Sequence, residues 1–292
     1  MDIAWPVRHL SYKQMIVIPL VLAAFFTAAI FVRGIPLSMD FAGGTYLTIT
    51  VENIENVPSA SVVEDELKKI IDAEIEVHQT DRGYDVEAST YLTDNQVENQ
   101  IKPYLLSELG IRGKYSIPER MSGVITGQHV NQAKNAVTGA AIAMGVIIFI
   151  ALRHFISVGS ILLVVGLDAL GVFGGMALLG IPLSFGSVTG LLLLIGYAVD
   201  TNILLSTKVL KRVGGTPRER AAEGMRTGLM MSGTSVAALT ALNVIMTPPL
   251  IKEFSGALII GILVDMVNTW LLNSGVLLRH VELQQRGYHG RI

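Results

Sequence analysis

The sequence of 292 residues contains no cysteine and has few charged side chains. The absence of cysteine excludes disulfide bonds, thiol nucleophiles, iron–sulfur clusters and zinc sites built on thiolates. Charged residues make up 16% of the chain, whereas soluble domains carry about 25%. The hydrophobic fraction is 51% and the mean hydropathy is +0.52. These values exclude an ordinary soluble enzyme and indicate a membrane protein.

A strong net charge and grouped metal ligands are also missing. The formal net charge of −2 excludes a strongly basic nucleic-acid-binding protein. The six histidines are scattered, and none pairs with another at a spacing of three or four residues. The phosphate-binding patterns G-x-x-x-x-G-K-[ST] and G-x-G-x-x-G are absent. We therefore expect no metal, no cofactor and no nucleic-acid partner.

Long hydrophobic runs, by contrast, are abundant. A bilayer requires roughly 20 apolar residues in a helix, and six stretches approach that length. The predicted spans are Met15–Val32, Ala136–Leu152, Val158–Leu179, Phe185–Leu205, Gly228–Met246 and Phe254–Leu278. The first is longer than the apolar region of a cleaved secretory signal, so we interpret it as an uncleaved anchor.

Basic residues alternate between the loops that join these spans. The loop after the fourth span contains six Lys and Arg residues, whereas the loop after the third contains none. Because cytoplasmic loops are enriched in Lys and Arg, we predict a multi-pass protein of the cell membrane with both termini in the cytoplasm. The expected domains are 1–33 (N-terminus and first span), 34–132 (extracytoplasmic domain), 133–279 (spans two to six) and 280–292 (cytoplasmic tail).

The segment 34–132 carries 16 acidic and 7 basic side chains and alternates between strand and helix patterns. The expected elements are a strand at Tyr46–Val51, a helix at Ser59–Asp72, two strands flanking the turn Asp81–Gly83, a helix at Asp94–Leu109 and a short strand at Lys114–Pro118. The order β-α-β-β-α-β predicts an α+β domain of ferredoxin-like type between the first two spans.

Three acidic residues lie inside predicted spans: Asp168, Asp200 and Asp265. An ionisable group within a bilayer costs about 2.5–3.5 kcal/mol on insertion scales and is a functional candidate by default. Asp200, with Thr201 and Asn202 beside it, is a candidate ion-coupling site. Asp265 and Asp168 are further candidates, and hydrogen bonds to neighbouring helices are the structural alternative for all three.

Two local patterns concern helix packing and helix starts. Gly171 and Gly175 form a G-x-x-x-G pattern, which lets membrane helices approach closely. Thr216-Pro217-Arg218-Glu219 is typical of a capping box, with Pro at the first helical position. We therefore expect a helix to begin at this point and to lead into the fifth span.

The hexapeptide D-F-A-G-G-T follows the first span and resembles the D-F-x-G-G-T signature of the SecF family, subunits of the SecD–SecF protein-export complex. Its signature positions here are Asp40, Phe41, Gly43, Gly44 and Thr45. The order of spans and outer domain is also similar over essentially the whole chain. The resemblance implies a six-span half of RND-superfamily type and a protein-export accessory subunit rather than an enzyme. Its implied partners are SecD, the Sec translocon channel, the translocating polypeptide and the lipid bilayer.

The stretch Gly196–Leu205, G-Y-A-V-D-T-N-I-L-L, looks like the family's fourth-span motif, whose Asp is implicated in proton-coupled export. The bacterial form G-Y-S-x-N-D-T places the acid one residue later, where this chain has Thr201. The bacterial fifth-span Arg corresponds here to an apolar residue near Met230. The A-V-D-x-N form and the short chain resemble an archaeal-type member. The resemblance implies that Asp200 carries the coupling ion, either a proton or sodium.

Two other functions are compatible with these features. A stand-alone small-molecule exporter of the RND superfamily would have to pair, because six spans are half of the usual set. An intramembrane aspartyl protease would use Asp168 and Asp200 as a pair that shares a proton, but the usual G-x-G-D pattern is absent. Co-purification with a second six-span protein would separate the export subunit from both alternatives.

Overall fold

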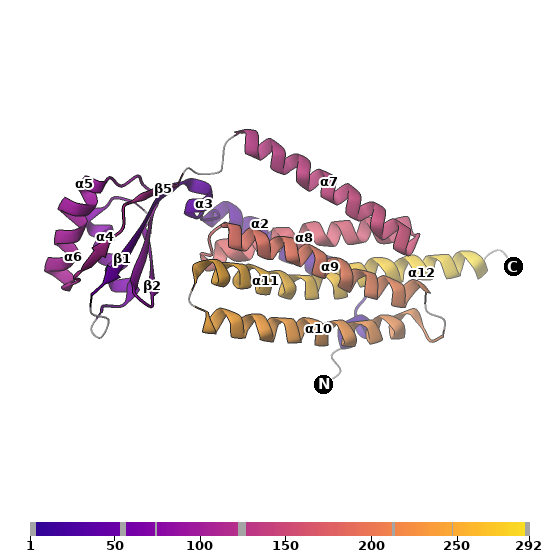
Figure 1. The fold of residues 1–292 in the computed structure, drawn as a ribbon. Coiled ribbons are helices and arrows are strands. Elements are labelled where there is room, and N and C mark those ends of the chain that lie inside the picture. The colour runs from indigo at the N-terminus through magenta and orange to yellow at the C-terminus, as the bar shows by residue number, and fades with distance from the viewer. Residues whose placement is uncertain are drawn as a thin grey trace.

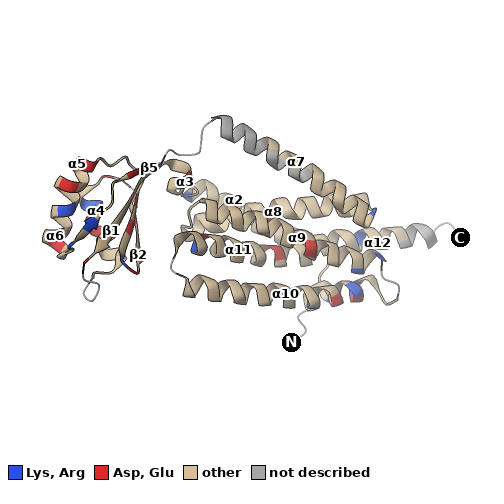
Figure 2. Cartoon of the chain, viewed as in Figure 1, with Lys and Arg blue, Asp and Glu red and all other residues tan. Residues whose placement is uncertain are grey.

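A computed structural model describes residues 4–52, 57–73, 75–121, 127–211, 214–246 and 248–289. A small sheet module lies at one end of the molecule, and a bundle of long helices forms the rest (Figure 1). Charged side chains are concentrated in the module and at the opposite end of the bundle (Figure 2). The last three residues of the expected tail lie outside the described residues.

Six helical stretches form the bundle. They are α2 (Tyr12–Arg33), α7 (Gly127–Leu152), α8 (Phe155–Leu179), α9 (Phe185–Lys211), α10 (Pro217–Ile245) and a continuous rod made of α11 (Pro249–Val267), the π-helical turn η3 (Asn268–Asn273) and α12 (Ser274–His289). Among the described residues, α2, α8, α9 and α10 are long and apolar enough to cross a membrane. They coincide with the first, third, fourth and fifth expected spans. The other two expected spans fall within α7 and the rod, and their crossing of the membrane stays a prediction.

Glycines bring α8 close to its neighbours. A Cβ atom on Gly171 would lie 2.5 Å from a methyl group of Val264, and one on Gly175 would lie 2.5 Å from Ile260. Both neighbours belong to α11, so the G-x-x-x-G pattern is a packing surface between α8 and the rod. One residue earlier, a Cβ on Gly174 would lie 2.4 Å from Phe26 of α2.

The predicted capping box is present at the start of α10. The Glu219 backbone N–H donates to the Thr216 hydroxyl at 3.2 Å, and the Thr216 N–H donates to the Glu219 carboxylate at 2.8 Å. Next to it, Arg218 donates to the carbonyl oxygen of Val7 at 3.1 Å. The short helix α1 (Trp5–His9) is thereby held at the end of the bundle where α12 also lies (Figure 1).

The sheet module follows the predicted order of elements. Its parts are β1 (Gly44–Val51), α4 (Ala60–Ile70), β2 (Ile75–Thr80), β3 (Gly83–Ala88), α5 (Asp94–Gln96), the π-helical turn η2 (Val97–Ile101), α6 (Lys102–Leu109), β4 (Gly113–Tyr115) and β5 (Glu119–Met121). The sheet order is β2-β3-β1-β4, every pair is antiparallel, and β5 also pairs with β1. The expected last strand at Lys114–Pro118 is correct only as far as Tyr115, and β5 begins after the expected range ends. Pro118 lies in the break between β4 and β5 because proline has no N–H for a ladder bond.

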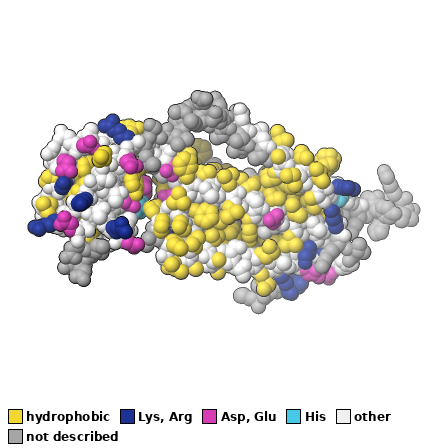
Figure 3. Space-filling view, in the orientation of Figure 1, with side chains coloured by type: hydrophobic (Ala, Val, Ile, Leu, Met, Phe, Trp, Pro, Cys, Tyr) yellow, Lys and Arg dark blue, Asp and Glu magenta, His cyan; other side chains and the backbone are white. Residues whose placement is uncertain are grey.

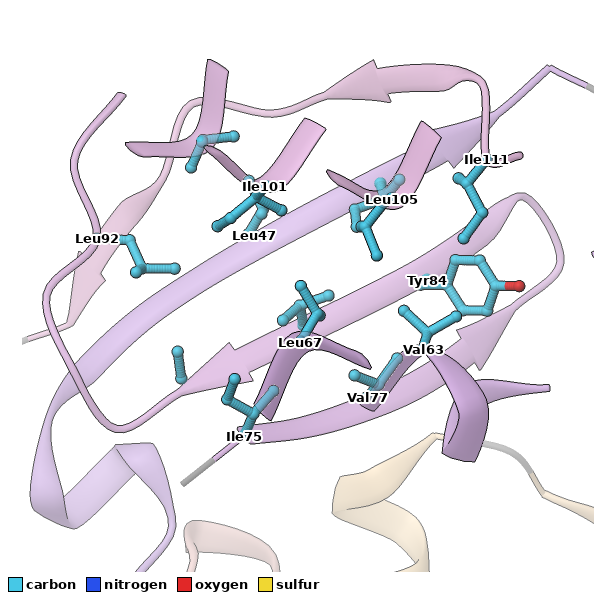
Figure 4. Close-up of a cluster of buried hydrophobic side chains, with 14 of the residues drawn as sticks. Leu47, Val63, Leu67, Ile75, Val77, Tyr84, Leu92, Ile101, Leu105 and Ile111 are labelled. Carbon is cyan, nitrogen blue, oxygen red and sulfur yellow. The ribbon is translucent and has the colours of Figure 1, made fainter. Parts of the chain in front are cut away.

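The module has its own hydrophobic core on one face of the sheet. Leu47 of β1, Leu67 of α4 and Leu105 of α6 belong to this core, and all three are at most 1% exposed (Figure 4). Alternation along β1 sets this register, because shifting the pairing by one residue would turn the apolar side chains to the other face. That other face is polar, and Thr48 donates there to Asp85 across the β1–β3 pair at 3.0 Å.

Candidate functional site

The signature residues form the joint between the module and the bundle. Asp40 lies in the single helical turn α3 (Met39–Ala42), and its Oδ2 accepts a hydrogen bond from the Phe185 N–H at 3.0 Å. Phe185 is the first residue of α9, so Asp40 caps that helix. The Phe41 ring packs on the Phe185 ring with centroids 5.5 Å apart. The joint therefore connects the module directly to the helix that carries Asp200.

The backbone just before the signature strengthens the same joint. Ser38 N–H donates to the Leu183 carbonyl at 3.1 Å, and Leu183 N–H donates to the Pro36 carbonyl at 2.8 Å. These bonds tie the chain leaving α2 to the loop between α8 and α9. The chain that enters α3 is therefore hydrogen-bonded to the loop that enters α9.

The last three signature residues turn the chain into the sheet. Gly43 has φ of +79°, a left-handed conformation that favours glycine. A Cβ on Gly44 would lie only 2.2 Å from the Ala88 carbonyl oxygen of the neighbouring strand. The buried Thr45 hydroxyl donates to the Thr90 carbonyl at 2.8 Å and accepts from the Leu92 N–H at 2.7 Å. The signature is thus a structural joint in which each of these residue types is required locally.

A polar network is buried in the middle of the bundle. Asp168 of α8 and Asp265 of α11 are 1% and 0% exposed. The hydroxyls of Thr269 and Thr201 donate to the two oxygens of Asp265 at 2.7 and 3.0 Å. The Asn268 side-chain N–H donates to Asp168 Oδ1 at 2.7 Å. Helices α8 and α9 and the rod of α11 and η3 therefore contribute to one carboxyl-centred site.

The network continues along α9 and η3 through buried amides. Asn202 donates to the Thr269 hydroxyl at 2.8 Å, and Asn273 donates to the Asn202 side-chain oxygen. Asn268, Thr269 and Asn273 all belong to the π-helical turn η3. A π turn inserts an extra residue into the helix and is frequent at functional sites. Here it brings two consecutive side chains, Asn268 and Thr269, into the interior together.

Asp200 does not join this network. Its side chain is exposed, whereas those of Thr201 and Asn202 are buried. It is the only charged residue between Phe185 and Thr207. The exposed positions on the same helix include Leu192 and Leu193, which are 65% and 54% exposed. Figure 3 shows that the visible face of the bundle is largely hydrophobic, with an acidic side chain set among the apolar ones.

The candidate residues predicted from the sequence therefore divide into two groups. Thr201, Asn202, Asp265 and Asp168 come together inside the bundle, and Asp200 lies on its surface. Asp168 and Asp200 consequently do not form the carboxyl pair that a protease would require. Thr269 was not among the predicted site residues. Its spacing of four residues from Asp265 places both on one helical face and is the signal that would have found it.

A second group of titratable side chains lies where the module faces the bundle. A cleft of about 480 Å³ is lined by Glu76 and His78 of β2 and by Lys252 and Glu253 of α11. The nearby Glu76 carboxylate, 3.6 Å from the imidazole, raises the pKa of His78. Burial raises the pKa of Glu87 on β3 to about 7. The junction therefore changes its charge near neutral pH.

Apolar helices of spanning length, a buried carboxyl network and a small antiparallel sheet together define a multi-pass helical membrane protein with a module outside the bundle. Residues 111–283 match the family model "Protein export membrane protein SecD/SecF, C-terminal". Residues 28–53 match the model "SecD/SecF GG Motif". The chain belongs to the SecD/SecF protein-export family.

Several relatives match nearly the full length. The "Protein-export membrane protein SecF" of Methanothermobacter thermautotrophicus is 34% identical over 281 residues, which cover 94% of each chain. The protein of the same name from Methanocaldococcus jannaschii is 31% identical over 274 residues, covering 91% of this chain and 95% of that one. Both organisms are archaea, which confirms the resemblance to an archaeal-type SecF.

Two solved structures share the fold. "Crystal structure of SecDF in Super-membrane-facing form" superposes with a TM-score of 0.66 at 22% identity, covering 100% of this chain and 40% of that one. A SecDF structure from Thermus thermophilus, described as a translocon-associated membrane protein, gives 0.63 at 22% identity, covering 94% and 38%. The chain thus spans about two fifths of the length of the SecDF structures it matches.

Proposed function

We propose that this chain is one half of a two-part export complex and works with SecD at the Sec translocon channel on a translocating polypeptide. The observation that carries the proposal is the exposure of Asp200 on an apolar helix. A charge facing lipid costs about 2.5–3.5 kcal/mol on insertion scales. A second membrane subunit packed on this face would remove Asp200 from lipid and provide polar groups for it.

The arrangement of helices supports a six-span half with an extracytoplasmic domain at 34–132. In this proposal α7 and the rod of α11, η3 and α12 supply the second and sixth spans at 133–279. The sheet order β2-β3-β1-β4, with helices crossing between the strands, supports a ferredoxin-like domain. The helices α1 and α12 lie at the end of the bundle opposite the module, which supports both termini being cytoplasmic.

The joint between module and bundle supports coupling to an ion gradient. Asp40 caps α9, and α9 carries Asp200 on its surface and Thr201 and Asn202 in its interior. A change in the module that shifts α3 would be transmitted to α9, and a change in the packing of α9 would be transmitted to the module. This is the route by which ion movement would act on a polypeptide outside the membrane.

Pull-down of the tagged protein from its native membrane in mild detergent, followed by mass spectrometry, tests the partnership. We expect SecD and channel subunits to co-purify. A homodimer alone would contradict the proposal and favour a small-molecule exporter of the RND superfamily.

Substitution of Asp200 tests the site directly. Asp200→Asn keeps the shape and removes the charge, so we expect severalfold slower export by a protein that still folds. Asp65→Asn, on the exposed surface of α4, is the matched control. Normal export by Asp200→Asn would show that the surface charge has no part in coupling.

A further inference from the structure

The buried pair Asp168 and Asp265 has no positive partner among the described residues. Each of the two carboxyls lies close to the other, and the groups around them in the described residues are Asn268, Thr201, Thr269 and Tyr197. Tyr197, on α9, is the remaining titratable neighbour, and its hydroxyl donates to Ser232 of α10 at 2.7 Å. Two ionised carboxylates at 1% exposure or less would therefore face one another with their charges uncompensated.

One of the four carboxyl oxygens of this pair accepts no hydrogen bond within the described residues. Of the four carboxyl oxygens, both of Asp265 and Oδ1 of Asp168 accept a hydrogen bond. Oδ2 of Asp168 is buried and has no donor in the described parts of the chain. A buried acceptor without a donor is destabilising, and more so when it is charged. The site therefore lacks one donor and one positive charge.

We propose that Asp168 and Asp265 form a proton-binding site inside the bundle, in which the two carboxyl groups share a single proton. The proton supplies the missing donor at Asp168 Oδ2 and cancels one of the two charges. Two carboxyls in one site behave in this way because both cannot ionise side by side. The site is distinct from Asp200, and it deepens the proposed ion coupling by naming the ion.

The surrounding donors fit a proton better than a metal cation. Thr201 and Thr269 direct their hydroxyl hydrogens at Asp265, and Asn268 presents its amide N–H to Asp168. These hydrogens lie against three of the four carboxyl oxygens that a cation would bind. Hard cations take several oxygen ligands, and the site has one free carboxyl oxygen.

Protonation of the Asp168–Asp265 pair affects α9, because Thr201 and Asn202 of the network belong to that helix. Loss of the shared proton leaves a second negative charge between α8, α9 and the rod. The like charges then repel across the α8–α11 contact, where glycine packing leaves little space. The chain of bonds from Asp265 through Thr269 to Asn202 carries the rearrangement along α9.

Infrared spectroscopy of the purified full-length chain in lipid nanodiscs tests this site. A protonated carboxyl absorbs apart from amide and carboxylate groups. We expect such a band at neutral pH in the wild type after subtraction of the contribution of Glu87, whose pKa is about 7 and which the variant Glu87→Gln measures. The remaining band should shift slowly in D₂O and stay unchanged in added sodium chloride. Asp168→Asn and Asp265→Asn should each abolish it, because the new amide donates to the remaining carboxylate. Asp65→Asn, which removes an exposed carboxyl of α4, should leave it unchanged.

Three results would overturn the proton site. They are absence of the band in the wild type, its removal by sodium, and its persistence in the folded double variant Asp168→Asn/Asp265→Asn. If a variant aggregates on gel filtration, the responses of the wild-type band to sodium and to D₂O still test whether the site holds a proton. The measurement uses the isolated chain, so failure of the pull-down would leave this site standing, and loss of the site would leave the SecD partnership standing.

Discussion

Substitution of Asp40 measures how firmly the module is joined to the bundle. The Asp40 carboxylate accepts the Phe185 N–H at 3.0 Å, at the first turn of α9. Losing such a cap costs about 0.5–2 kcal/mol, and losing a negative charge at a helix N-terminus costs about 0.3–1 kcal/mol. Asp40→Asn keeps an acceptor and loses only the charge. Asp40→Ala loses both, so we expect the free energy of opening the first turn of α9 to fall by about 1–3 kcal/mol.

Amide hydrogen exchange at the start of α9 is the assay that isolates this bond. Each 1.4 kcal/mol corresponds to a tenfold change in an equilibrium, so Asp40→Ala should accelerate exchange of the Phe185 amide by about fivefold to a hundredfold. Asp40→Asn should produce a smaller change. Asp65→Ala on the exposed surface of α4 is the control and should leave α9 unaffected.

Two outcomes would refute this account of Asp40. Unchanged exchange at Phe185 in Asp40→Ala would show that the carboxylate does not cap α9. Equal acceleration in the Asn and Ala variants would show that only the charge matters and that the hydrogen bond contributes nothing. Either result would remove the proposed mechanical connection between the module and α9.

Three further predictions concern stability. Thr45→Val should lower the free energy of unfolding by about 1–3 kcal/mol, because the buried Leu92 N–H loses its acceptor. Thermal unfolding measures this loss of stability. The folded pKa of Glu87 is raised to about 7 from 4.5, so the contribution of Glu87 to stability is full below pH 4.5 and is lost as the pH rises from 4.5 through 7. Melting curves from pH 4 to 8 should show that Glu87→Gln removes this part of the pH dependence. Gly171→Ala should lower the free energy of unfolding by about 1–3 kcal/mol, as measured by thermal unfolding, because the added Cβ would overlap Val264.

Each of these predictions has a matched control. Thr45→Ser retains the hydroxyl and should stay close to the wild type. Gly166→Ala lies on the same helix with no atom within 4 Å of the added Cβ, so it should be neutral or slightly stabilising. Equal melting temperatures for the Gly171 and Gly166 variants would contradict close packing of α8 on the rod. An unchanged pH profile in Glu87→Gln would show that burial of Glu87 does not influence folding.

Patterns within single elements were readable from the sequence. The capping box at Thr216, the strand Tyr46–Val51 and the spacing of Gly171 and Gly175 all appear in the structure with the predicted role. Each depends on contacts within a few residues or on one periodicity, so neighbouring residues specify it. The D-F-x-G-G-T signature was also visible, but its mechanical role was not, because Phe185 lies 145 residues after Asp40.

Only the tertiary structure decided which of the three acidic residues is exposed and which two are buried together. Successive residues of an α-helix point about 100° apart, since a turn contains 3.6 residues. Asp200 is therefore exposed while the next residue, Thr201, is buried against Asp265. The rotation of α9 about its axis, and the choice of Asp265 rather than Asp200 as the partner of Asp168, depend on how α8, α9 and α11 pack together. That packing is set by side chains far apart in the sequence, so sequence spacing could nominate the three acids but could not pair them.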